Sequence, residues 1–113
     1  MEKRIIYSTE VTVSNMVLEE EREMKVEEVY LQGIIWRCSQ RKLFGIIPLS
    51  DKYEYKVYPH IFVRNKYTGG VHATVPSLLS FESRKRLMEE QQNLEAWLRN
   101  KCNEYKKEYG KSR

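Results

Sequence analysis

The C-terminal segment from Phe81 to Tyr109 constrains the fold more than any other part of the sequence, because it has one clear period. Its apolar or near-apolar residues recur at steps of three and four, the repeat of one face of an α-helix. They are Leu87, Gln91, Leu94, Leu98, Cys102, Tyr105 and Tyr109. Ser80 suits the start and Gly110 the end of such a helix. We therefore expect a helix over 80–109 that packs one face on a sheet.

The preceding residues, 1–78, have the alternating patterns of β-strands. We expect a bulge near Glu27–Glu28 in the second strand and a hairpin between Ile34–Trp36 and Leu43–Ile47. A short helix within the Glu-rich residues 18–28 is the competing interpretation. The predicted strands are Ile5–Val13, Met24–Trp36, Leu43–Leu49, Tyr53–Arg64 and Val71–Val75.

The strand over 53–64 has two different faces. One carries residues such as Val57 and Ile61, and the other carries Tyr58 and Phe62 among charged side chains. Which face the helix covers is left open, although an alternating strand in a one-helix domain usually buries its aromatic side. The loop over 65–70 contains a Gly pair, and a register that joins Val63 to Val71 places apolar residues together.

The sequence therefore predicts one α+β domain over 1–113, an antiparallel sheet of about five strands with a long C-terminal helix on one face and a short tail over 110–113. A helix of this length would run about 43 Å. A compact domain of this size has a radius of gyration of about 13 Å, so we expect the helix to break or to overhang the sheet.

Charge is distributed unevenly along the chain. Residues 1–32 hold four basic and eight acidic side chains, whereas residues 33–80 hold seven basic and two acidic ones. The sequence lacks a long apolar run and a signal-peptide pattern, which favours a cytoplasmic protein, cellular or viral, without a membrane partner. Two distant cysteines, Cys38 and Cys102, are expected to be free thiols. Glu, Lys and Arg are abundant, a balance similar to that of thermophile proteins.

The favoured function is nucleic-acid binding without catalysis. Aromatic side chains stack on bases and basic side chains neutralise phosphates, and both kinds gather on the predicted hairpins between residues 37 and 67. The candidate residues are Arg37, Arg41, Lys42, Lys56, Tyr58, Arg64 and Lys66.

The alternative is a protein-interaction or homodimerisation module that uses the helix. An overhanging helix end would expose apolar side chains that the sheet does not cover. The candidate contacts are Trp97, Tyr105 and Tyr109.

A third alternative is a metal-dependent nuclease. Pro48, Asp51, Glu54 and Lys56 resemble a fragment of the PD-(D/E)xK nuclease motif, in which two carboxylates hold a divalent metal and the lysine assists the attacking water. Asp51 is only three residues from Glu54, too close for a separate preceding strand. This interpretation ranks last, and no cofactor is expected.

A metal site built from the histidines is not expected either. His60 and His72 would share a sheet face in the predicted register, but no short ligand spacing accompanies them.

Overall fold

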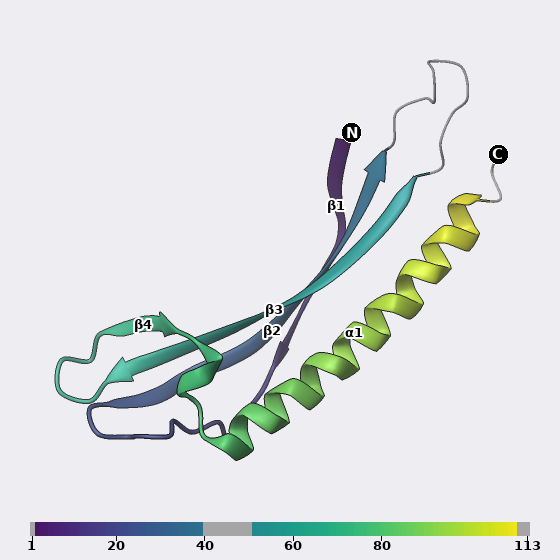
Figure 1. Ribbon diagram of the computed structural model, residues 1–113. Helices are drawn as coiled ribbons and strands as arrows, with labels where there is room; N and C mark the ends of the chain where they lie inside the picture. Colours follow the sequence, from purple (N-terminus) through teal and green to yellow (C-terminus); the bar gives the residue numbers. More distant parts are fainter. Residues whose placement is uncertain (1, 40–50, 111–113) are drawn as a thin grey trace.

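The computed structural model describes residues 2–39 and 51–110, with the backbone alone at 109 and 110. One antiparallel sheet and one long helix make up this part of the chain, in the strand order β1-β2-β3-β4 (Figure 1). The elements are β1 (Glu2–Thr12), β2 (Met24–Ser39), β3 (Lys52–Asn65), β4 (Val71–Thr74), the 3-10 turn η1 (Pro76–Leu78) and α1 (Phe81–Gly110). The α+β class with a long C-terminal helix is confirmed. The sheet has four strands in the described residues, and the strand expected over 43–49 lies outside them.

Strand β2 is the centre of the sheet. It pairs with β1 along one edge and with β3 along the other, so that Trp36 lies opposite Ile5 and opposite Glu54. Both edges of β2 are thus occupied over residues 34–36, and the other half of the predicted hairpin, residues 43–47, lies outside the described residues. The expected bulge is confirmed, since the register with β3 shifts between Val26 and Glu28. Residues 18–23 form no helix.

A second bulge, which the sequence pattern did not indicate, lies in β1 between Ile5 and Tyr7. It reverses the inside and outside positions of the first residues of the strand. Ile5 therefore lies on the opposite face from Tyr7 and is 55% exposed, instead of sharing its face as predicted.

Helix α1 packs along one face of the sheet (Figure 1). Its predicted stripe is the buried side, because Leu87, Leu94, Leu98 and Cys102 all belong to the hydrophobic core. Burial in apolar surroundings raises the pKa of the Cys102 thiol. The strand residues of this core, which point toward α1, are Val29, Leu31, Ile35, Val57, Ile61 and Val63.

Gly33 lets the helix approach the middle of β2. A Cβ atom at this position would lie 3.0 Å from Leu98 Cδ1 and 3.3 Å from both Leu94 Cδ2 and Thr9 Cγ2. Almost no space is left above the Gly33 backbone, because these three side chains fill it.

Ser80 holds the start of α1. Its Oγ accepts a hydrogen bond from the Ser83 backbone N–H at 3.2 Å, as expected of an N-cap. The Oγ of Ser83, which is buried, accepts in turn from the Val17 N–H at 3.0 Å. The cap therefore also fixes the helix start to the segment that joins β1 to β2.

The register between β3 and β4 differs by one residue from the prediction. Val63 lies opposite His72, and Phe62 lies opposite Ala73. Directly paired residues share a face, so His72 lies on the same side as Val63, whereas His60 lies on the other. The predicted placement of both histidines on one face is therefore wrong.

The molecule is elongated, with extents of 63 × 23 × 18 Å and a Cα radius of gyration of 19.1 Å. Helix α1 is unbroken over 30 residues. It does not overhang a compact sheet, because β2 and β3, at 16 and 14 residues, are as long as the helix. The expectation of a broken or overhanging helix is therefore wrong. No helix in the described ranges has the length and apolar character to cross a membrane.

Candidate functional site

The face of the sheet opposite α1 has no helix against it in the described residues (Figure 1). We call it the uncovered face. The favoured expectation that α1 buries Tyr58 and Phe62 is wrong, because the helix packs on the side of Val57 and Ile61. The aromatic side of β3 is therefore left half-buried at the surface.

The uncovered face carries aromatic rings from two neighbouring strands. Tyr30 of β2 and His60 of β3 are directly paired, and their rings stack with centroids 4.7 Å apart. Tyr30 also stacks on Phe62 at 6.1 Å, and Trp36 meets Tyr58 edge to face at 6.4 Å. These five residues, which we call the aromatic row, are all half-buried, so each has one side packed and another accessible.

Lysines lie over two of these rings. Lys56 Nζ is 5.1 Å from the centroid of Tyr58, and Lys3 Nζ is 4.5 Å from that of Trp36. Lys3 also forms an ion pair of 3.1 Å with Glu54 Oε2. Both contacts are cation–π interactions within the chain, in which the ammonium group lies over the face of an aromatic ring.

The aromatic row is further held by a hydrogen bond across the sheet. His60 Nε2 and Gln32 Oε1 are 3.0 Å apart, and the ring nitrogen serves as donor in the tautomer that satisfies the amide oxygen. Ile34 is buried on the same face, between Trp36 and Gln32 along β2. The rings are thus supported from below and from the sides.

Arg64, predicted to bind nucleic acid, is engaged within the chain. Its guanidinium donates to both carboxylate oxygens of Glu27, at 2.9 and 2.7 Å, and to the carbonyl of Gly69 at 2.8 Å. The charge-assisted hydrogen bonds lower the pKa of Glu27 and raise that of Arg64. Lys66 donates to the backbone carbonyl of Glu21 at 3.0 Å. Both cations fix the loop end of the molecule.

Of the other predicted cations, one lies on the opposite face of the sheet and two lie outside the described residues. Arg37 points to the side of α1, where its Nε donates to Asp51 Oδ2 at 2.7 Å. Arg41 and Lys42 lie outside the described residues. Of the residues predicted to bind nucleic acid, the structure therefore brings Lys56 and Tyr58 together and places Arg64 farther along the same face.

The carboxylates of the nuclease-like pattern do not converge. Asp51 contacts Arg37 on the α1 side, whereas Glu54 lies on the uncovered face with Lys3. Within residues 2–39 and 51–110, no group of three or more His, Cys, Asp or Glu side chains is placed to hold a metal ion. Cys38 and Cys102 are both buried free thiols.

The predicted partner contacts on α1 pack largely on their own sheet. The ring of Tyr105 stacks on Tyr53 of β3 at 6.3 Å, and Trp97 contacts Tyr7 of β1 at 5.5 Å. Trp97 is still 46% exposed, but Met88, also exposed, lies nine residues away and so on the opposite side of the helix. The side chain of Tyr109 lies outside the described residues. These exposed apolar groups therefore form no continuous stripe.

Sequence reasoning missed the β2 half of the aromatic row. Tyr30 and Trp36 alternate with Leu31 and Ile35, so the signal was present in the pattern of β2. The alternation alone does not show that these rings lie beside those of β3. The β2–β3 register shows this, because it places Tyr30 opposite His60.

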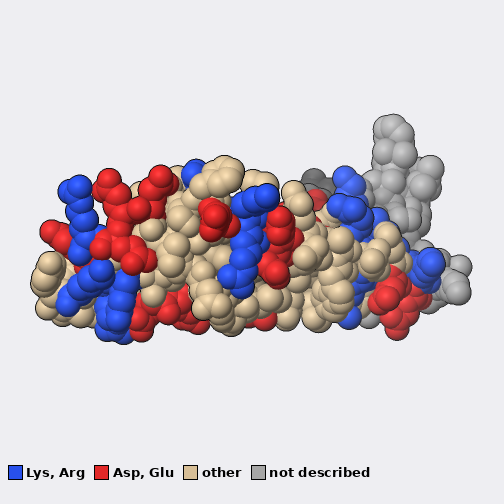
Figure 2. Space-filling view, turned by 90° about the horizontal axis from the view of Figure 1, so that it is seen from below, with Lys and Arg blue, Asp and Glu red and all other residues tan. Residues whose placement is uncertain are grey.

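The charge of the uncovered face is mixed. Lys25, Lys52 and Lys56 lie on it, but so do Glu10 and Glu28. The side of the molecule seen in Figure 2 likewise shows Lys and Arg alternating with Asp and Glu along its length, with no continuous basic area. Comparison of the chain with protein-family models, curated proteins and solved structures finds no match.

Proposed function

We propose that the chain is a non-catalytic binding module that takes single-stranded nucleic acid on the uncovered face of its sheet. The observation that carries this proposal is the aromatic row, in which rings from β2 and β3 stand side by side with lysines against them. Four-stranded sheets with exposed aromatic side chains are a known platform for unpaired bases.

The preference for a single strand follows from shape and charge. Stacking of a base on an aromatic side chain contributes about 1–3 kcal/mol and needs bases that are free of a duplex. Duplex binding depends instead on many phosphate contacts, and the carboxylates of Glu10 and Glu28 weaken the positive potential of this face. We therefore expect single-stranded oligonucleotides to bind more tightly than the duplex of the same length.

The expected salt dependence is modest. Three lysines of the uncovered face, Lys25, Lys52 and Lys56, make no ion pair among the described residues. Neutralising about three phosphates of a single strand gives a slope of log affinity against log salt near −2. Raising the salt from 50 to 200 mM should therefore weaken binding by about 20-fold.

Tryptophan fluorescence supplies a local measurement. In the variant Trp97→Phe the only tryptophan left is Trp36, which belongs to the aromatic row. We expect a labelled 12-nucleotide oligo(dT) or oligo(rU) to gain anisotropy with this protein and to quench Trp36. Tyr58→Ala should weaken binding about tenfold or more, while Tyr67→Ala, in the turn between β3 and β4, should leave it unchanged.

The proposal fails if no oligonucleotide binds at 50 mM salt, or if binding leaves Trp36 fluorescence unchanged. It also fails if Tyr58→Ala and Tyr67→Ala bind equally well. Self-association through α1 remains a prediction from the sequence, and light scattering at several protein concentrations tests it.

A further inference from the structure

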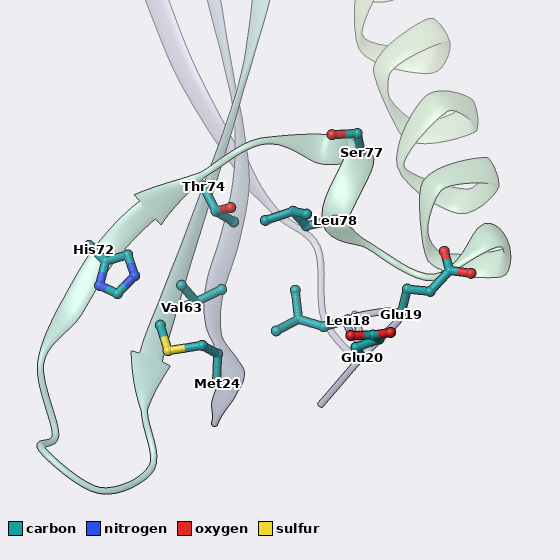
Figure 3. Close-up of a pocket in the computed structure, with 9 residues that line it drawn as sticks. All are labelled: Leu18, Glu19, Glu20, Met24, Val63, His72, Thr74, Ser77 and Leu78. Carbon is teal, nitrogen blue, oxygen red and sulfur yellow. The ribbon is translucent and has the colours of Figure 1, made fainter. Parts of the chain in front are cut away.

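The end of the sheet that carries β4 is not covered by the helix. Helix α1 begins at Phe81, and the side chains of Met24, Val63 and His72 on its side of the sheet lie beyond that start (Figures 1 and 3). Turn η1 and residues 16–20 cover this end instead. They leave between themselves and the strands a cleft of about 540 Å³.

Backbone hydrogen bonds hold the outer wall of the cleft. The Glu19 N–H donates to the Leu78 carbonyl at 3.0 Å, and the Ser80 N–H donates to the Val17 carbonyl at 2.9 Å. Leu18 and Leu79 form an antiparallel bridge between the same two segments. The wall is therefore tied both to the β1–β2 connection and to the helix start, and the cleft is part of the fold.

The floor of the cleft is apolar. Figure 3 shows Leu18, Met24, Val63 and Leu78 directed toward one common space. Val63 and Leu18 are buried, but Leu78 remains 53% exposed. Its neighbour Val75 is 55% exposed. Exposed apolar surface beside a concave site of 300–1,000 Å³ is typical of a ligand site.

The mouth of the cleft is negatively charged. Glu19 and Glu20 are the acidic residues that line it, and no Lys or Arg of residues 2–39 and 51–110 does so. Glu19 lies 4.0 Å from Arg84 Nη2, so part of its charge is offset. Glu20 is exposed and makes no ion pair within the described part of the chain. The remaining polar side chains that line the cleft, His72, Thr74 and Ser77, are hydrogen-bonding groups.

We propose that this cleft binds a small amphipathic amine, whose aliphatic part rests on Met24, Val63 and Leu78 and whose ammonium group faces Glu20. The apolar floor selects the aliphatic part by removing it from water. The Glu20 carboxylate selects the charge of the ligand head group, because it attracts an ammonium group and repels another carboxylate. This site lies on the α1 side of the sheet and is independent of the uncovered face.

Methyl NMR of methionine tests the proposal at the site itself. Met24 lines the cleft, whereas Met16 is buried in the core and Met88 lies on α1. Protein labelled with ¹³C at the methionine methyls is titrated with n-octylamine, octanoate and octanol, each at neutral pH and below its aggregation concentration. Met24→Leu assigns the cleft signal and keeps the side-chain volume.

We expect n-octylammonium to shift the Met24 methyl signal saturably and to bind at least tenfold more tightly than octanoate, with octanol in between. Glu20→Gln should remove most of the difference between the two charged probes, and Glu20→Lys should reverse their order. Glu89→Gln, an exposed position on α1, is the matched control and should behave as the parent protein.

Three results would overturn the proposal. One is a Met24 signal that does not move up to the aggregation limit of the amine. Another is an equal shift of Met88 and Met24, which would mean non-specific adsorption. The last is a preference for octylammonium that survives Glu20→Lys, because the charge of Glu20 would then play no part.

Discussion

The close approach of Leu98 in α1 to Gly33 in β2 predicts how substitutions at these two positions change the free energy of unfolding. Leu98 is fully buried, and its Cδ1 is 3.0 Å from the position that a Cβ of residue 33 would take. Leu98→Ala should lower the free energy of unfolding by about 2–5 kcal/mol, through lost burial and the cavity that remains. Gly33→Ala gains about 0.5–1 kcal/mol from the strand conformation, but the new methyl group forces the neighbouring side chains to shift, an overpacking cost of about 1–3 kcal/mol.

The two substitutions should not be additive. Once Leu98 is shortened, the closest atom to the new methyl of residue 33 is gone and the methyl occupies part of the cavity. Gly33→Ala should then stabilise the Leu98→Ala background by up to about 1–2 kcal/mol, since the strand gain is kept and about 0.8 kcal/mol of burial is added. The interaction energy in the double-mutant cycle should therefore be about 2–4 kcal/mol in favour of the double variant, the sum of the relieved overpacking and the added burial.

Urea unfolding of the four proteins at 25 °C, followed by far-UV circular dichroism, measures this cycle. Comparison requires equal m values, because a changed slope would indicate altered compactness. The control cycle pairs Gly33→Ala with Leu87→Ala, a buried leucine about 16 Å farther along the helix. The close fit of α1 over β2 would be refuted if Gly33→Ala and Leu98→Ala were additive within about 0.5 kcal/mol, as Gly33→Ala and Leu87→Ala are expected to be.

Three further predictions follow from single contacts. Ser80→Ala removes the acceptor of the Ser83 N–H at the helix start and should cost about 0.5–2 kcal/mol in urea unfolding; an unchanged midpoint would show that the cap is dispensable. Arg64 lowers the pKa of Glu27 in the folded state, so the pair stabilises the fold above the unfolded-state pKa of Glu27, and this stability is lost as the pH falls through the folded-state pKa. Carboxyl NMR titration should show a higher folded-state pKa of Glu27 in Arg64→Gln than in the parent protein. An equal pKa in both proteins would contradict the pairing. Trp97→Ala should lower the unfolding free energy by about 1–3 kcal/mol without changing the mass seen by light scattering, whereas a changed mass would identify Trp97 as a partner contact.

The features predicted correctly from the sequence are those that depend on local pattern. The stripe through Leu87, Leu94 and Leu98 indicates both the helix and its buried side, and Ser80 marks its start. The bulge in β2 is predicted because the apolar phase changes between Val26 and Val29. Each of these signals is contained within a few residues, so no information about distant partners is needed.

The errors concern pairing between segments. In the loop after β3, the Asn65 Oδ1 accepts from the N–H groups of Tyr67 and Thr68, and the Asn65 N–H donates to the Gly70 carbonyl at 2.8 Å. This geometry fixes the β3–β4 register one residue away from the pairing that hydrophobicity favours, and His72 changes face as a result. A loop conformation of this kind cannot be deduced from apolar pattern alone.

Only the β3 part of the candidate site was predicted, because the β2 part depends on the pairing between strands. Lys56 and Tyr58 are two residues apart on one strand, and so alternation alone places them together. Trp36 joins them only through the register between β2 and β3, across a connection that pattern does not determine. Gly33 lies on the side that α1 covers, where its missing side chain leaves room for Leu94 and Leu98 of the helix.

The elongated shape has a consequence for hydrodynamic measurements on this protein. A radius of gyration of 19.1 Å is that of a compact chain of about 300 residues, although this chain has 113. A single copy will therefore elute early from a gel-filtration column calibrated with spherical standards, at a position that suggests two or three copies. The frictional ratio from sedimentation velocity separates the two explanations, since a rod-like monomer has a high ratio at the mass of one chain.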